Sequence, residues 1–287
     1  TGLLNGDSVT NVTLASLGTI NATAGTVDVN AGTFTNNGTI ESNAATVNVN
    51  AGTFTNDGAI QVSGGTLLMN SSNWQPSSGS LAINNATLQL QGNYSLASLN
   101  LGSFSRTGGS VQLTSGTLTN TGETLTLNSS TGTWSLQGGR IVGGTLSFAD
   151  GQTLSTNSSS NNRLSGVTVT NDIVLSASSA TLLVDGGTTI PTVRMSGGNS
   201  RLFLASGATL PGKVVFEGSN SLLRTVSSNG TGSFTIGANQ TISTAAGFAG
   251  TGAPRVLTWC PTCNIQLSEI VMPSTGASFN LEHVVPY

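Results

Sequence analysis

Charge is the scarcest property of this sequence of 287 residues, because charged residues make up 7% of the chain. An ordinary soluble domain carries about 25%. All Lys and Arg residues lie between Arg106 and Arg255, so residues 1–105 contain no cation. Nucleic acids and anionic membranes bind clustered Lys and Arg. The composition therefore argues against both as partners.

Long apolar runs are also missing, and no window approaches the ~18 continuous apolar residues of a membrane helix. The first five residues, Thr1 to Asn5, lack a signal-peptide layout, so we expect a mature product or an excised fragment. Frequent Gly argues against extended helices. Hydrophobic residues nevertheless make up 36% of the chain and the net charge is only −3. Disordered chains have the opposite balance, so we expect a folded core.

The most informative positive feature is an internal repeat of about 20 residues. Residues 26–38 read TVDVNAGTFTNNG and residues 46–58 read TVNVNAGTFTNDG. Apolar positions alternate with polar Thr and Asn, which is typical of strands with one buried face. The apolar positions recur in four columns: Leu14, Phe34, Phe54, Trp74; Ile20, Ile40, Ile60, Leu81; Val27, Val47, Leu67, Leu88; and Val29, Val49, Met69, Leu90.

Three short strands per repeat, separated by Gly or Asn, predict a coil. Stacked coils pair each strand with the coil above and below at ~4.8 Å, which satisfies the backbone amides. We therefore predict an all-β fold, a right-handed parallel β-helix (β-solenoid) of about 20-residue coils with the apolar columns as its core. Gly18, Gly38, Gly58 and Gly79 are predicted at corners, where φ can be positive.

The second part of the chain carries a related repeat, in which Leu182, Leu202 and Leu222 are spaced by twenty. Pro191 and Pro211 are predicted at a corner or bulge, because proline cannot donate to a ladder. Residues 156–164 lack alternation and predict a loop and a possible break. We expect repeats over 1–245. The changed sequence of 246–287 predicts a distinct C-terminal cap or a subunit junction.

The phrases GTFTNNGTI, GGTL and GATLP, on this period with outward Thr, Ser and Asn, resemble the parallel β-helix passengers of bacterial autotransporters and filamentous-haemagglutinin-like exoproteins. The resemblance covers about residues 10–245. It implies a secreted, surface-displayed stalk or adhesin.

Catalysis on a β-helix would require carboxylates that converge on one outer face. In the well-phased coils, Asn48 follows Asp28 and Gln61 follows Glu41 one repeat later. We therefore expect no enzymatic activity and no cofactor or metal. A pair such as Asp172 with Asp185 stays open, because the repeat does not place these residues.

The two cysteines lie in the motif Trp259-Cys260-Pro261-Thr262-Cys263. A thioredoxin-like redox site would need a helix that begins at the first cysteine. A zinc site would need four ligands, and His283 is the only histidine. We predict a local disulfide between Cys260 and Cys263 that staples the cap in an oxidising compartment.

The polar column Asn30, Asn50, Asn70 is predicted to form stacked amides that hydrogen-bond from coil to coil. The leading expectation for function is a non-catalytic structural or adhesive β-solenoid at the bacterial cell surface. Its partners would be further copies joined head to tail into a filament, or a host or cell-surface glycan or protein receptor. The alternative is a β-helix that binds or degrades polysaccharides.

Overall fold

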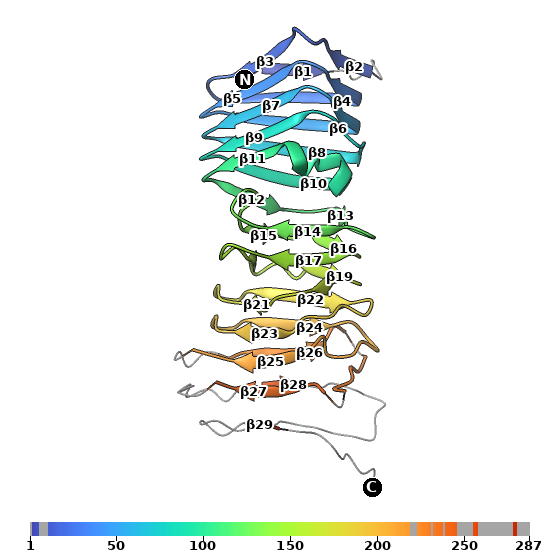
Figure 1. Cartoon of the computed structure of the whole chain (residues 1–287), viewed down its shortest axis with the longest axis vertical. Helices are drawn as coiled ribbons and strands as arrows, with labels where there is room; N and C mark the ends of the chain where they lie inside the picture. The colour runs from blue at the N-terminus through green and yellow to red at the C-terminus, as the bar shows by residue number, and fades with distance from the viewer. Residues whose placement is uncertain are drawn as a thin grey trace. The chain divides into compact units, whose positions relative to one another are not determined.

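The computed structural model describes residues 2–5, 11–218, 223–230, 232–237, 239–245, 255–257 and 278–279. They form a parallel β-solenoid, as the sequence predicts, and it has about 10 turns (Figure 1). The chain divides into two compact units. Unit 1 comprises Thr1–Ser135, Gly139–Ile141 and Phe148–Thr153, and unit 2 comprises Leu136–Gly138, Val142–Ser147 and Leu154–Tyr287.

Unit 1 is built around two stacks of parallel strands. The first stack pairs in the order β1 (Gly2–Asn5), β4 (Thr26–Asn36), β6 (Thr46–Asn56), β8 (Thr66–Trp74) and β10 (Thr87–Ser95), with β2 (Asn11–Leu14) also beside β4. The second stack pairs in the order β3 (Thr19–Ala22), β5 (Thr39–Asn43), β7 (Ala59–Ser63), β9 (Ser80–Asn84) and β11 (Phe104–Thr107). A short helix α1 (Leu96–Leu99) and a 3-10 turn η1 (Leu101–Ser103) connect β10 to β11.

The middle of the chain has shorter strands. They are β12 (Ser110–Leu113), β13 (Thr117–Thr119), β14 (Thr124–Leu127), β15 (Trp134–Leu136), β16 (Arg140–Val142), β17 (Thr145–Phe148) and β18 (Leu154–Thr156).

Unit 2 has two further stacks of strands (Figure 1). One pairs β19 (Arg163–Ser165), β22 (Thr181–Asp185), β24 (Arg201–Leu204), β26 (Thr225–Ser228) and β28 (Arg255–Leu257). The other pairs β21 (Ile173–Val174), β23 (Thr192–Met195), β25 (Lys213–Phe216), β27 (Ile242–Thr244) and β29 (Ser278–Phe279). β20 (Thr168–Val169) lies between β19 and β21 along the chain. Of the predicted cap, only β28 and β29 are described. Cys260 and Cys263 lie outside the described residues.

The predicted core columns are confirmed in the coils that contain β4, β6 and β8. Phe34, Phe54 and Trp74 lie in register and are at most 5% exposed, with ring centroids 5.6 and 5.4 Å apart. Tyr94 extends this stack, 6.1 Å from Trp74, although sequence reasoning did not include it. The columns Ile20, Ile40, Ile60, Leu81 and Val47, Leu67, Leu88 are also buried and paired in register.

Two predicted core residues behave differently because the first coil is irregular. Val12 pairs with Phe34, whereas Leu14 pairs with Asn36 and is only half-buried, so the predicted placement of Leu14 is wrong. The reason is a longer corner: six positions separate Leu14 from Ile20, and four separate Asn36 from Ile40. Val27 is also half-buried, because its partner in β1 is Gly2, which has no side chain.

The glycine column lies at a corner as predicted, but for another reason. Gly18, Gly38, Gly58 and Gly79 are not among the residues with positive φ. Instead, a Cβ on Gly58 would lie 2.1 Å from the carbonyl oxygen of Gly38, and a Cβ on Gly79 would lie 2.2 Å from that of Gly58. Stacked corners approach so closely that a side chain cannot fit between them. Positive φ occurs at a different corner, at Ala44 (55°) and Gly64 (65°).

The repeat in unit 2 also departs from its predicted register. Leu182 pairs with Leu202 as expected, but Leu202 then pairs with Val226 rather than Leu222. A longer connection between β25 and β26 causes this shift. Arg224, which is buried, anchors that connection: its Nε donates to the carbonyl of Met195 (3.1 Å) and its Nη2 to that of Ser196 (2.9 Å).

The other two predictions for unit 2 concern turns. Pro191 lies immediately before β23, and Pro211 lies two residues before β25. The carbonyl of Pro191 accepts from the backbone N–H of Lys213, and the carbonyl of Pro211 accepts from the backbone N–H of Ile190. Their placement at corners is confirmed. The loop predicted over 156–164 is shorter, at 157–162, since Thr156 ends β18 and residue 163 begins β19.

Candidate functional site

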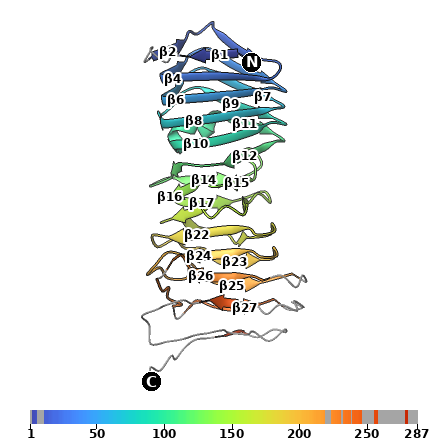
Figure 2. The ribbon, with the colours of Figure 1, turned by 180° about the vertical axis from the view of Figure 1, so that it is seen from behind.

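The most regular surface of unit 1 is the outer side of β4, β6, β8 and β10, which Figure 2 shows stacked in that order. Along each strand the buried core residues alternate with side chains that point outward. These outward residues form three columns in register, here called the polar face: Thr26, Thr46, Thr66, Thr87; Asp28, Asn48, Leu68, Gln89; and Asn30, Asn50, Asn70, Gln91.

Hydrogen bonds link side chains of the polar face from coil to coil. Asn50 Nδ2 donates to Asn30 Oδ1 (3.0 Å), and Asn70 Nδ2 donates to Asn50 Oδ1 (3.3 Å). Beside them, Asn48 Nδ2 donates to Asp28 Oδ1 (2.7 Å). The predicted amide ladder is therefore confirmed. Sequence reasoning missed the Thr column, although its signal, Thr at each repeat start, was present.

The ladder leaves part of the hydrogen-bonding capacity of its amides unused. A primary amide has two N–H donors and two acceptor lone pairs. Asn50 donates one N–H to Asn30 and accepts from Asn70 through one lone pair, so one N–H donor and one lone pair of Asn50 remain. The residues of the polar face are half-buried or exposed, so these remaining groups face solvent.

Acidic residues in unit 1 face neutral partners. Asp28 pairs with Asn48 and Glu41 pairs with Gln61, as the repeat predicts. Asp57 Oδ1 accepts from both the backbone N–H (3.1 Å) and the hydroxyl (2.7 Å) of Ser78. Hydrogen bonds from Ser129, chiefly from its backbone N–H, lower the pKa of Asp150 below its ordinary value. The hydrogen bonds from Ser129 therefore stabilise the charged form of Asp150.

In unit 2, Asp172 and Asp185 each contact a different arginine. Arg194 Nε donates to Asp172 Oδ2 (2.9 Å), and Arg194 Nη1 bonds Glu217 Oε1. These hydrogen bonds, that with Asp172 first, raise the pKa of Arg194. Two carboxylates of unit 2 thus converge on one guanidinium.

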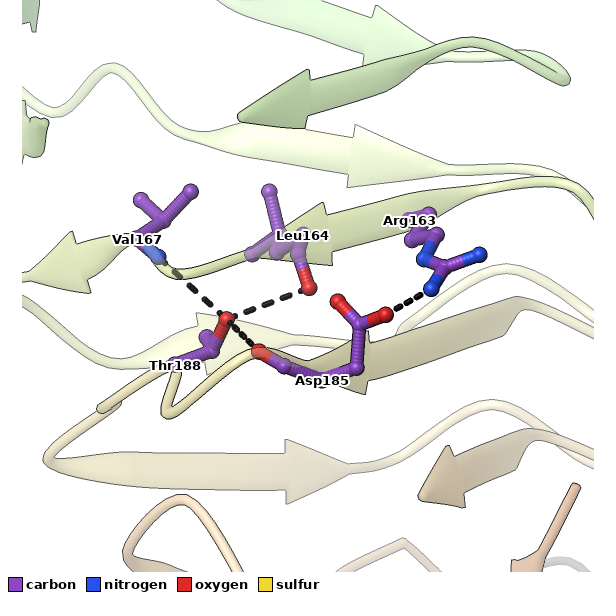
Figure 3. Close-up of polar contacts among 5 residues, drawn as sticks. All are labelled: Arg163, Leu164, Val167, Asp185 and Thr188. Atoms are coloured by element: carbon purple, nitrogen blue, oxygen red, sulfur yellow. Dashed lines mark hydrogen bonds and ion pairs between the residues drawn. The ribbon is translucent and has the colours of Figure 1, made fainter. Parts of the chain in front are cut away.

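Asp185 lies in a second cluster, drawn in Figure 3, where its Oδ2 pairs with Arg163 Nη2. The buried hydroxyl of Thr188 lies within hydrogen-bonding distance of the carbonyls of Leu164 (3.1 Å) and Asp185 (2.7 Å), and accepts from the backbone N–H of Val167 (3.3 Å). These bonds join the corner after β22 to the preceding coil. A hydroxyl held in this way stabilises the corner and is not placed to act as a nucleophile.

A metal centre and a surface hollow are two other kinds of candidate site. Among the described residues, no three His, Cys, Asp or Glu side chains gather where they could hold a metal ion. An open hollow in unit 2 is bordered by Ile190, Pro191, Pro211 and Lys213. The predicted disulfide between Cys260 and Cys263 cannot be placed, since both lie outside the described residues.

The parallel stacked coils and the polar face define a β-solenoid with a patterned outer surface. No family model, no curated protein and no solved structure matches this chain. Within the part of the chain that the structure describes, no helix combines the length and the apolar character needed to cross a membrane.

Proposed function

We propose that this protein is a non-catalytic structural or adhesive β-solenoid of the bacterial cell surface, whose outer faces and not an enclosed active site do its work. The polar face carries the proposal. It presents mostly uncharged polar side chains, Thr in one column and Asn or Gln in another, in register over four coils, which suits a surface that makes repeated weak contacts. The ion pairs of Asp172, Asp185 and Glu217 with arginines in unit 2 add support, because they give these carboxylates a structural role.

Location outside the cell rests on two sequence features. The 20-residue phrases such as GTFTNNGTI resemble passengers of autotransporters and filamentous-haemagglutinin-like exoproteins, which are displayed on the surface. The absence of Lys and Arg from residues 1–105 also leaves trypsin-like proteases no cleavage site there. The proposed partners are a host or cell-surface glycan or protein receptor.

The alternative function is the binding or degradation of polysaccharides. The polar face, whose one charged residue is Asp28, favours its binding form. To separate these activities, the purified chain would be incubated with a panel of neutral and acidic polysaccharides and with surface proteins. We expect retention of at least one ligand and no release of reducing ends. Reducing ends that appear with time would overturn the non-catalytic proposal.

Self-association into a head-to-tail filament is a second form of the structural role. Analytical ultracentrifugation over a range of protein concentrations, with electron micrographs of the same samples, would test it. A filament subunit shows mass that grows with concentration and visible fibres. A monodisperse monomer at all concentrations would refute the filament but leave the adhesive role standing.

A further inference from the structure

The polar face has the properties of a preorganised binding surface. Side chains that are free in solution lose rotamer entropy when a ligand orders them. Asn50 and Asn70 are already held by ladder bonds of 3.0 and 3.3 Å, and Asn48 is held by Asp28. Binding of a ligand to their remaining N–H groups and lone pairs would therefore lose less rotamer entropy than binding to a surface whose side chains are not hydrogen-bonded to one another.

From this face we propose that the protein binds an uncharged polysaccharide across β4, β6, β8 and β10, an inference that rests on the proposed adhesive function. Asn50 keeps one N–H donor and one acceptor lone pair outside the ladder, and each sugar hydroxyl also donates and accepts. Leu68, half-exposed among these amides, offers an apolar contact for the C–H side of a sugar ring.

The charge of the surface selects the class of glycan. Residues 1–105 contain no Lys or Arg, so an acidic glycan finds no ion pair on the polar face, and Asp28 would repel it. Asp28 is the only charged residue of the face, which is too little to hold a polycation. Hydrogen bonding to neutral sugars is the chemistry that remains.

The repeat also sets the direction of the bound chain. Equivalent side chains recur every ~4.8 Å along the stacking direction. One sugar of an extended polysaccharide spans a comparable length. A chain that lies along the Asn30, Asn50, Asn70 column therefore meets the same amide in each coil, and the weak contacts add through their linkage.

The test measures binding of the full chain to three immobilised polysaccharides by biolayer interferometry. The probes are xyloglucan and mixed-linkage β-glucan, which are neutral glucans with largely extended β-1,4-linked backbones, and polygalacturonate, which is acidic. We expect binding to at least one neutral glucan, with the affinity changed less than about twofold between ~50 and ~500 mM salt, because no ion pairs are involved. Polygalacturonate should bind more weakly.

A double variant, Asn50→Ala with Asn70→Ala, removes the ladder amides and should weaken glucan binding about tenfold. Gln61→Ala is the matched control, because Gln61 is an exposed amide on β7, outside the polar face, and should change affinity less than about twofold. Thermal unfolding followed by circular dichroism checks that each variant folds. If the double variant does not fold, Asn70→Ala alone serves, with about threefold weakening expected.

The outcomes separate this inference from the proposed function. Binding of another ligand but of neither neutral glucan, stronger binding of polygalacturonate, or unchanged glucan binding by the asparagine variants would overturn the polar face as a neutral-glycan site. The adhesive role would survive each of these. A wild-type chain that retains no glycan or protein in any assay, or that cleaves the glucans, would refute the adhesive function as well.

Discussion

The aromatic stack inside unit 1 offers the sharpest test of how the coils are held together. Phe54 is fully buried, with its ring centroid 5.6 Å from Phe34 and 5.4 Å from Trp74. Truncating a buried Phe to Ala removes apolar contact and leaves a cavity, which costs about 3–5 kcal/mol. Phe54 contacts aromatic rings in the coils on both sides, so Phe54→Ala should lower the free energy of unfolding by about 4 kcal/mol.

Urea unfolding at 25 °C, followed by circular dichroism, measures this loss. Fluorescence of Trp74 should also change in the folded state, because it loses its edge-on partner. Thr53→Ala is the control, since Thr53 lies on the same strand, faces outward and should change stability by less than about 0.5 kcal/mol. A loss below about 1 kcal/mol for Phe54→Ala, or one equal to that of the control, would refute the stacked-core account.

Three further predictions concern single positions in unit 1. The hydroxyl of Tyr94 is buried with no hydrogen-bond partner among the described residues, and burial raises the pKa of Tyr94. Tyr94→Phe should therefore raise the free energy of unfolding by about 1 kcal/mol at pH 7. The neutral tyrosine contributes stability below the unfolded pKa of about 10, and this is lost as pH rises further, so the variant should lose less stability than wild type in urea titrations at about pH 10.5. Ala44→Gly should stabilise the protein by about 1 kcal/mol in the same assay, because Ala44 has φ of 55° and is exposed; a lower stability would contradict the strain. Gly58→Ala should lower the melting temperature by several degrees, since its Cβ would lie 2.1 Å from the oxygen of Gly38; an unchanged melting temperature would show that this corner can open.

Much of unit 1 could be predicted because each residue type repeats at one interval. Val47 and Leu67 occupy one column for the same reason that Asn50 and Asn70 do: their strands pair at a constant offset of twenty residues. The offset fails where the chain lengthens between strands. Leu88 pairs with Val111, which is 23 residues later, and no local pattern indicates this longer offset.

The candidate site was predictable only in part. The Asn column follows from the period, and its ladder bonds follow from the chemistry of amides. That Arg194 would join Asp172 to Glu217 could not be foreseen, because the three lie on different coils and on segments outside the clear repeat. Tyr94 follows Trp74 at the regular interval of twenty residues, so the period itself carried the signal that Tyr94 joins the aromatic stack.

Periodicity and composition were sufficient to establish a parallel β-solenoid with an apolar interior and a weakly charged exterior. The reason is that the alternation of apolar and polar residues is local and recurs in each repeat. Long-range packing determined the rest. The glycine corner is glycine because a neighbouring carbonyl lies 2.1 Å from the position of a Cβ on Gly58, and not because of its own φ. Leu14 misses the core because its corner is two residues longer. Such distances depend on how one coil lies on the next, which a single repeat does not encode.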